Sequence, residues 1–137
     1  MRVVIIDGQG GGMGRALTER LRAASPEAEI VAVGTNVLAT AAMLKAGASA
    51  GATGENAVRV NCRRADVILG PLGIVMADAL LGEITPAMAL AVARSRARRV
   101  LVPTNRCDTL VVGVAAGSMT ALVQQAVDEV QAVCAGR

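Results

Sequence analysis

The 137-residue chain contains no phenylalanine, tyrosine, tryptophan or histidine, and only one lysine. The lack of histidine removes the side chain that most often acts as a general acid or base near neutral pH. The lack of aromatic rings removes the usual stacking surfaces for nucleic-acid bases. Because 53% of the residues are nevertheless hydrophobic, the core must be built from aliphatic side chains.

The charge balance and the cysteines narrow the class of protein further. Fourteen basic and eleven acidic residues give a net charge of +3, which is too small to predict nucleic-acid binding. Cys62, Cys107 and Cys134 are odd in number and form no CxxC pair, which predicts reduced thiols and no zinc site. The N-terminus lacks the apolar core of a signal peptide, and glycine, serine and glutamine interrupt the longest uncharged run, 109–127. We therefore expect a cytoplasmic protein without a metal site or membrane contact.

Short apolar runs alternate with helical patterns, which is typical of βαβ units around a mainly parallel sheet. Only seven residues separate the last two apolar runs, whereas a parallel crossover needs a dozen or more. The run 110–114 is therefore predicted to be an antiparallel strand at an edge of the sheet. The prediction is one three-layer α/β domain over residues 1–137. Strands are expected at 2–6, 29–33, 66–69, 99–102 and 110–114, and helices at 12–24, 37–46, after a cap at Thr53, near 74–81, from Thr85-Pro86 and at 118–134.

The stretch DGQGGGMG places five glycines within the seven positions 8–14, between the first strand and the first helix. Glycine permits positive φ angles and close backbone approach, so free N–H groups and the helix N-terminus can face an anion. The loop therefore predicts a site for a nucleotide or another phosphorylated small molecule. A tight turn that only lets the helix pack on the sheet, with nothing bound, is the alternative. The candidate binding residues in the loop are Gly8, Gln9, Gly10, Gly11, Gly12, Met13 and Gly14.

This loop resembles the cofactor loop of short-chain dehydrogenases, and Gly8, Gly12 and Gly14 match the cofactor-binding glycines of that family. The resemblance covers the first βαβ unit and makes NAD(P) a candidate cofactor. Two features depart from the family. The acidic residue expected at the end of the second strand is absent from the sequence VGTN, and the chain has no tyrosine for the Tyr-x-x-x-Lys pair. We therefore do not expect a conventional short-chain dehydrogenase, and whether the protein is an enzyme stays open.

Ligands of parallel sheets bind at the C-terminal ends of the strands, so the loops there supply further candidates. Thr35 and Asn36 follow the second strand and could bond a ribose hydroxyl. Asn105 and Arg106 follow the fourth predicted strand. The guanidinium of Arg106 could bind a phosphate or a carboxylate, or it could be a solvated arginine of a turn.

Few polar residues remain as catalytic candidates, and each has a structural alternative. Asp7 could contact a phosphate through a metal, act as a catalytic carboxylate, or hold the loop by accepting backbone hydrogen bonds. Glu55 could be an acid–base group or could complement a helix dipole, and Cys107 could be a nucleophile or a small buried thiol. The arginines of 94–99 end a helix on the opposite side of the sheet, where they are expected to act as dipole partners.

Six segments taken together are similar to a small bacterial family known only as a domain of unknown function: IDGQGGGMG, GTNVLATAAMLKAGA, GATGENA, GPLGI, LGEITP and NRC. The resemblance extends over nearly the whole chain and implies a Rossmann-like domain standing alone. It supplies no activity and no catalytic residue.

The composition leaves two alternatives to a ligand-binding domain of this kind. One is a non-catalytic sensor or protein-interaction domain, and the other is a structural domain whose glycine loop is empty. A high apolar content without aromatic residues favours a homo-oligomer that buries alanine, leucine and methionine faces.

Overall fold

The computed structural model describes residues 1–104, 109–114 and 117–136. In this part of the chain one sheet is formed, with the strand order β3-β2-β1-β4-β5, and every neighbouring pair is parallel. This is the order of the first five strands of the Rossmann fold, so the predicted Rossmann-like α/β class is confirmed. The strands are β1 (Arg2–Asp7), β2 (Glu29–Gly34), β3 (Ala50–Thr53), β4 (Val67–Pro71) and β5 (Arg98–Val102).

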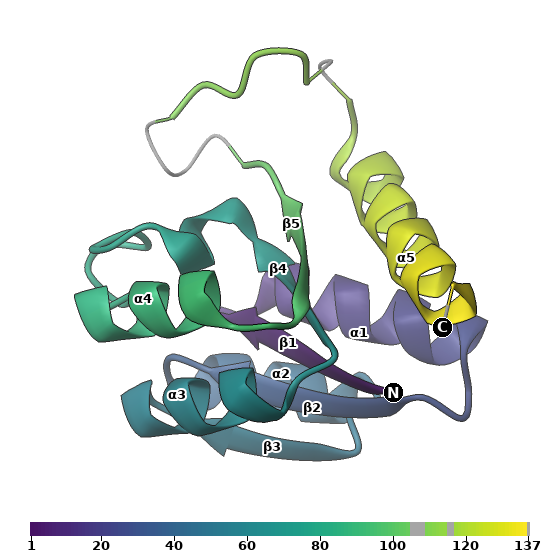
Figure 1. Cartoon of the computed structure of the whole chain (residues 1–137), viewed down its shortest axis with the longest axis horizontal. Helices are drawn as coiled ribbons and strands as arrows, with labels where there is room; N and C mark the ends of the chain where they lie inside the picture. The colour runs from purple at the N-terminus through teal and green to yellow at the C-terminus, as the bar shows by residue number, and fades with distance from the viewer. Residues whose placement is uncertain (105–108, 115–116, 137) are drawn as a thin grey trace.

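Helices cover both faces of the sheet and complete three layers (Figure 1). On one face lie α1 (Gly12–Ala24), α2 (Val37–Lys45) and α5 (Met119–Ala135). On the other lie α3 (Glu55–Arg64), the 3₁₀ helix η1 (Leu72–Val75) and α4 (Pro86–Arg94). Among the described residues, no helix has both the length and the apolar character needed to cross a membrane.

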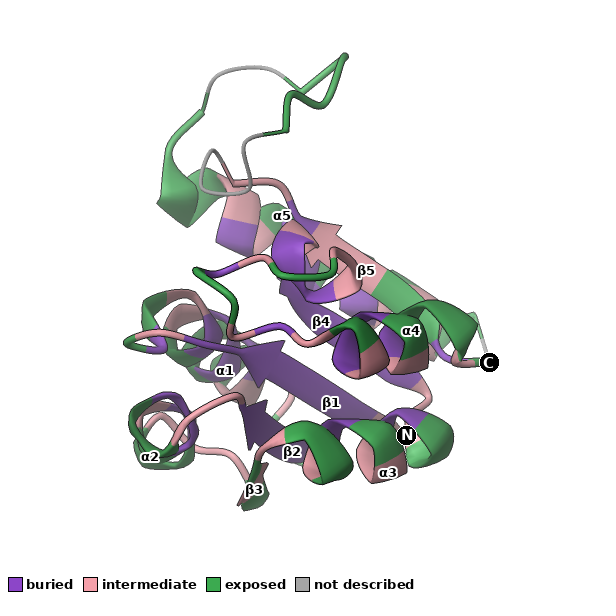
Figure 2. Cartoon of the chain, turned by 90° about the vertical axis from the view of Figure 1, so that its left-hand side faces the viewer, coloured by how far each residue is buried: buried purple, intermediate pink, exposed green. Residues whose placement is uncertain are grey.

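The central strands are buried on both faces, as Figure 2 shows for β1. Val3 and Ile5 belong to the core beneath α1 and α5, whereas Val4 and Ile6 belong to the core beneath α3 and α4. A strand covered by helices on both sides needs an uninterrupted apolar run, and the sequence VVII supplies it. The same burial fixes the polar loop after β1 at the C-terminal edge of the sheet.

The predicted antiparallel edge strand is wrong. Residues 110–114 are exposed and irregular, with a turn at 112–113, and β5 pairs with β4 in a parallel register. The strand that completes the sheet is β3 (Ala50–Thr53), a stretch of small residues outside the strands expected from the sequence. Strand formation depends on a partner more than on intrinsic propensity, and β2 supplies that partner through the register from Val31–Ala50 to Gly34–Thr53.

Two of the expected helix positions also differ from the structure. The helix expected near 74–81 is replaced by η1 and a series of turns, in which Asp78, Leu80 and Leu81 have left-handed φ angles between 57° and 67°. A left-handed conformation cannot continue a right-handed helix. The cap of α3 is Gly54 and not Thr53. The cap of α4 is Thr85, as expected, and its hydroxyl accepts a hydrogen bond from the Met88 amide.

Candidate functional site

The C-terminal edge of the sheet has a cavity of about 730 Å³ where the chain reverses its direction of winding. From β1 the chain moves outward to β2 and β3, then crosses to β4 on the other side of β1. Such a switch point is the usual ligand position in open α/β sheets. The cavity is lined by residues 7–13, by Pro71 at the end of β4, by Pro103 and Thr104 after β5, and by side chains from the segment leading into α5.

Asp7 holds the two ends of the glycine loop together. The residue is 5% exposed. One oxygen accepts a hydrogen bond from the Gly8 amide at 2.8 Å, and the other accepts one from the Gly14 amide at 2.6 Å. Of the roles considered for Asp7, the structure therefore bears out the loop-holding one, because both carboxylate oxygens bond the backbone of the loop itself.

Two glycines of the loop are required by packing. Gly11 has a φ of 74°, and a Cβ built on it would lie 2.8 Å from Cα of Ala39 in α2. A Cβ on Gly14 would lie 2.6 Å from Sδ of Met43. These distances are too short for any side chain, so the two glycines let α1 approach α2. The alternative explanation of the motif, a tight turn that lets the helix pack, accounts for these two positions.

Gly10 and Gly12 have no such explanation, whereas a Cβ on Gly8 would also be crowded, at 2.6 Å from Oγ1 of Thr35. The amides of Gly8, Gln9, Gly11 and Gly14 donate hydrogen bonds to oxygens of the protein, and we call them the anchored amides. Within the described part of the chain, no acceptor bonds the amides of Gly10, Gly12 and Met13, which we call the open amides. A Cβ built on Gly10 or Gly12 would have no atom within 4 Å. The three amides thus lack an acceptor in the described part of the chain, and the backbone of Gly10 and Gly12 adjoins free space at the N-terminus of α1.

A carboxylate that the sequence analysis did not single out lies beside the loop. Oε1 of Glu83 accepts hydrogen bonds from the Gln9 amide (3.0 Å), the Thr35 hydroxyl (2.6 Å) and Nδ2 of Asn36 (2.7 Å). Burial disfavours the charged form of Glu83, but the three hydrogen bonds outweigh it and hold the pKa of Glu83 below its ordinary value. Glu83 is therefore an ionised carboxylate at the C-terminal end of β2.

The same cluster fixes an unusual backbone conformation at Gln9. Its φ is 51°, in the left-handed region that residues other than glycine seldom adopt. Glu83 accepts a hydrogen bond from its N–H, and Nδ2 of Asn36 donates one to its carbonyl at 2.9 Å. Both polar groups of the Gln9 backbone are thus satisfied by side chains, which stabilises the turn that precedes the open amides.

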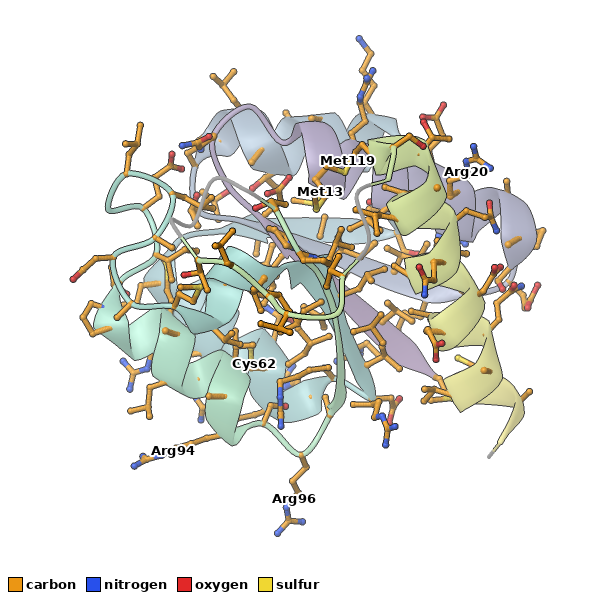
Figure 3. The ribbon with its side chains drawn as sticks, turned by 90° about the horizontal axis from the view of Figure 1, so that it is seen from above. Met13, Arg20, Cys62, Arg94, Arg96 and Met119 are labelled. Atoms are coloured by element: carbon orange, nitrogen blue, oxygen red, sulfur yellow. The ribbon has the colours of Figure 1, made fainter. Side chains whose placement is uncertain are left out.

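The opposite wall of the cavity is apolar. Figure 3 shows Met13 of α1 and Met119 of α5 in the same region, and both side chains line the cavity. Leu110 and Val111 line it as well. The segment that carries them is exposed to solvent, with Leu110 94% and Val112 98% accessible. A molecule in the cavity would contact backbone amides on one side and aliphatic side chains on the other.

The structure brings only some of the predicted site residues together. Residues 8–13 line the cavity, whereas Gly14 is buried beneath them. Thr35 and Asn36 lie beside the loop but not among the lining residues, because their side chains bond Glu83 and Asn36 also caps α2. Asn105 and Arg106 lie outside the described residues.

Glu55, a further catalytic candidate within the described residues, does not line the cavity. Glu55 is exposed at the start of α3, and its carboxylate accepts a hydrogen bond from the hydroxyl of Thr85. Cys107 lies outside the described residues. Cys62 is a free thiol whose pKa burial raises to about 11, so it remains protonated at neutral pH.

The arginines of 94–99 do not line the cavity. Arg94 and Arg96 are exposed and project outward, away from Met13 (Figure 3). Across the described ranges, no group of three or more cysteine, aspartate or glutamate side chains is arranged to hold a metal ion.

Comparison with known proteins identifies a family but no function. No curated protein matches the chain. The crystal structure of a dodecameric FMN-dependent UbiX-like decarboxylase from Escherichia coli O157:H7 is similar at a TM-score of 0.48 and 18% identity, over 96% of this chain and 76% of that chain. A likeness of this size carries no argument about ligand or assembly. The model of one family matches residues 2–135, and the chain therefore belongs to the family described as Domain of unknown function (DUF3842).

Proposed function

We propose that the protein binds a nucleotide or another phosphorylated small molecule, with a phosphate at the open amides. The single observation that carries this proposal is the position of the amides of Gly10, Gly12 and Met13. They have no acceptor in the described part of the chain, and they border a cavity of about 730 Å³. Ligand sites of small molecules span about 300–1,000 Å³, so the cavity has the size of such a site.

The electrostatics at the start of α1 support an anion. The helix has 13 residues, with no side-chain cap and no acidic residue within its first turn, so Asp7, which bonds the Gly14 amide, is the carboxylate described at the positive end of its dipole. Asp7 lies beneath the loop, but its oxygens accept bonds from Gly8 and Gly14. A phosphate would therefore meet N–H donors that no carboxylate has already taken.

A thermal-shift titration tests the proposal with pyrophosphate, ADP, NAD and a sugar phosphate as probes. A ligand present at 100 times its Kd stabilises the folded state by about 2.7 kcal/mol, which raises the midpoint of unfolding by several degrees in a domain of this size. The proposal fails if none of these probes shifts the midpoint.

The variant Gly12→Asp locates the site. A side chain at Gly12 meets open space, and a carboxylate in the first turn of a helix adds about 0.5 kcal/mol of stability. We therefore expect a folded protein that no longer binds the phosphate. Gly12→Asn has the same shape without the charge and is the matched control. Affinities for pyrophosphate that differ by less than about tenfold between the two variants would place the anion elsewhere, since juxtaposed like charges are far more costly.

A second candidate function is self-association through the segment between β5 and α5. Leu110 and Val112 are almost fully exposed, and a groove of about 500 Å³ lies between β5 and α5, lined by Val102 and Leu122 among others. Because one chain carries both the apolar segment and the apolar groove, a second copy supplies a partner for each. Analytical ultracentrifugation of the wild type and of Leu110→Asp tests this, and a monomeric wild type contradicts it.

We further propose that the protein is located in the cytoplasm and that residues 1–137 form a single domain. Two thiols of the described residues, Cys62 and Cys134, are unpaired, as in proteins of reducing compartments. Limited proteolysis of the full chain tests the domain assignment, since a second domain would be released as a separate stable fragment.

A further inference from the structure

The geometry points to Glu83 as the residue that accepts a hydrogen bond from a ribose hydroxyl of the ligand, so that the ligand is a ribonucleotide with an unsubstituted 2′-hydroxyl. The inference rests on the proposed function, because it places the sugar next to a phosphate bound at the open amides. It assigns a binding role to a residue outside the glycine loop.

One of the two carboxylate oxygens of Glu83 has no hydrogen-bond partner among the described residues. All three hydrogen bonds that reach its carboxylate, from Gln9, Thr35 and Asn36, end on Oε1. Within the ranges that the structure describes, no donor bonds Oε2. The structural role of Glu83 in holding Gln9 is therefore complete without Oε2. Glu83 is partly exposed, and a carboxylate oxygen without a partner can accept a hydrogen bond from a ligand.

The position of this oxygen matches a known requirement of nucleotide recognition. In doubly wound α/β folds a carboxylate at the end of the second strand bonds the 2′-hydroxyl of the ribose. The sequence VGTN at the end of β2 has no acidic residue, but Thr35 and Asn36 bring the Glu83 carboxylate to that place. Glu83 itself does not line the cavity, but it bonds the amide of Gln9, which lines the cavity and directly precedes Gly10. The sugar adjoining the phosphate would therefore lie at the edge of the cavity next to Glu83.

Two further features fit a nucleoside at this point. Val37 and Leu38 follow Asn36 at the start of α2, and they are 72% and 73% exposed. Exposed aliphatic side chains beside a sugar site provide an apolar surface for a base. Neither of them nor any residue of 34–38 is an arginine or lysine, so a 2′-phosphate would find no positive side chain there and would be repelled by Glu83.

The test compares pyrophosphate, ADP and 2′-deoxy-ADP by isothermal titration against the full chain. The wild type should bind ADP about tenfold more tightly than 2′-deoxy-ADP, since a hydrogen bond to a charged group is worth at least one factor of ten. Glu83→Gln keeps the shape and an acceptor for the three internal bonds. Because a charge-assisted hydrogen bond is roughly twice as strong as a neutral one, the preference for ADP over 2′-deoxy-ADP should fall to about threefold. Loss of the negative charge should leave pyrophosphate affinity equal or higher, so the ratio of the two nucleotide affinities is the readout.

Glu29→Gln is the matched control, because Glu29 lies at the opposite end of β2 and pairs with Arg2. It should keep the tenfold preference. Equal wild-type affinities for ADP and 2′-deoxy-ADP would overturn the role of Glu83 and leave the phosphate site standing, as would an unchanged preference in Glu83→Gln. Failure of all three probes to bind the wild type would overturn the proposed function as well. If Glu83→Gln does not fold, the wild-type comparison of the two nucleotides decides alone.

Discussion

The anchored and the open amides of the glycine loop differ in their surroundings although they alternate along seven residues. Around the anchored amides, carboxylates, a carbonyl and neighbouring helices occupy the space next to the backbone, as Gly11 and Gly14 illustrate. Around the open amides of Gly10 and Gly12, the space is free. The comparison shows that one glycine-rich sequence serves two physical requirements, close packing of helices and exposure of N–H donors.

The largest effect is expected where packing requires glycine. Gly11→Ala introduces a left-handed alanine, which costs about 1–2 kcal/mol, and a Cβ that would lie 2.8 Å from the backbone of Ala39, which costs about 1–3 kcal/mol more. We expect the free energy of unfolding in urea to fall by about 3 kcal/mol. Gly10→Ala is the control, and it should change this free energy by less than about 0.5 kcal/mol. Equal losses in the two variants would remove the distinction between the two kinds of position.

A smaller effect is expected at the carboxylate that ties the loop. Asp7→Asn keeps one oxygen acceptor and places an amide NH₂ group against the N–H of Gly8 or Gly14. One buried donor then loses its acceptor, so stability should fall by about 2 kcal/mol, as measured by urea denaturation at pH 7. Retained stability would mean that the anchored amides do not depend on Asp7, whereas pyrophosphate affinity reports separately on the open amides.

The smallest effect is the contribution of Glu83 to the pH dependence of stability. Since its pKa lies below the ordinary value of 4.5 in the folded protein, its ionised form adds stability above pH 4.5, and this contribution is lost as the pH falls through the folded pKa. The difference in unfolding free energy between wild type and Glu83→Gln should stay below about 1 kcal/mol, because Glu83 is partly exposed. It should shrink as acid is added, and a difference that grows toward low pH would contradict this assignment.

The sequence predicted the parts of the fold that depend on local patterns. The run VVII before a glycine loop, the alternation of strands and helices, and the cap at Thr85 are all present in the structure. It failed where the outcome depends on a distant partner. The residues LVVGV at 110–114 have high strand propensity but form no strand, whereas AGAT at 50–53 pairs with β2.

The site was predictable to the same extent. The glycines and the loop-holding role of Asp7 could be inferred, because both lie within one strand–loop–helix unit. Glu83 could not, since 74 residues separate it from Gln9 and its surroundings arise only when the turn after η1 folds back on β1 and β2. The segment LGEITP is one of the six that resemble the family, but no local feature of the sequence indicates a role for its glutamate.

The bond between Gln9 and Glu83 also limits how this fold can be divided. A unit cut after residue 34 retains the opening strand, every glycine of the loop and the first helix, yet it lacks the side chain that fixes the turn. Transplanting that unit into another scaffold would carry the motif without its geometry. The loop geometry is thus not modular, and during synthesis it becomes complete only after Glu83 has been added.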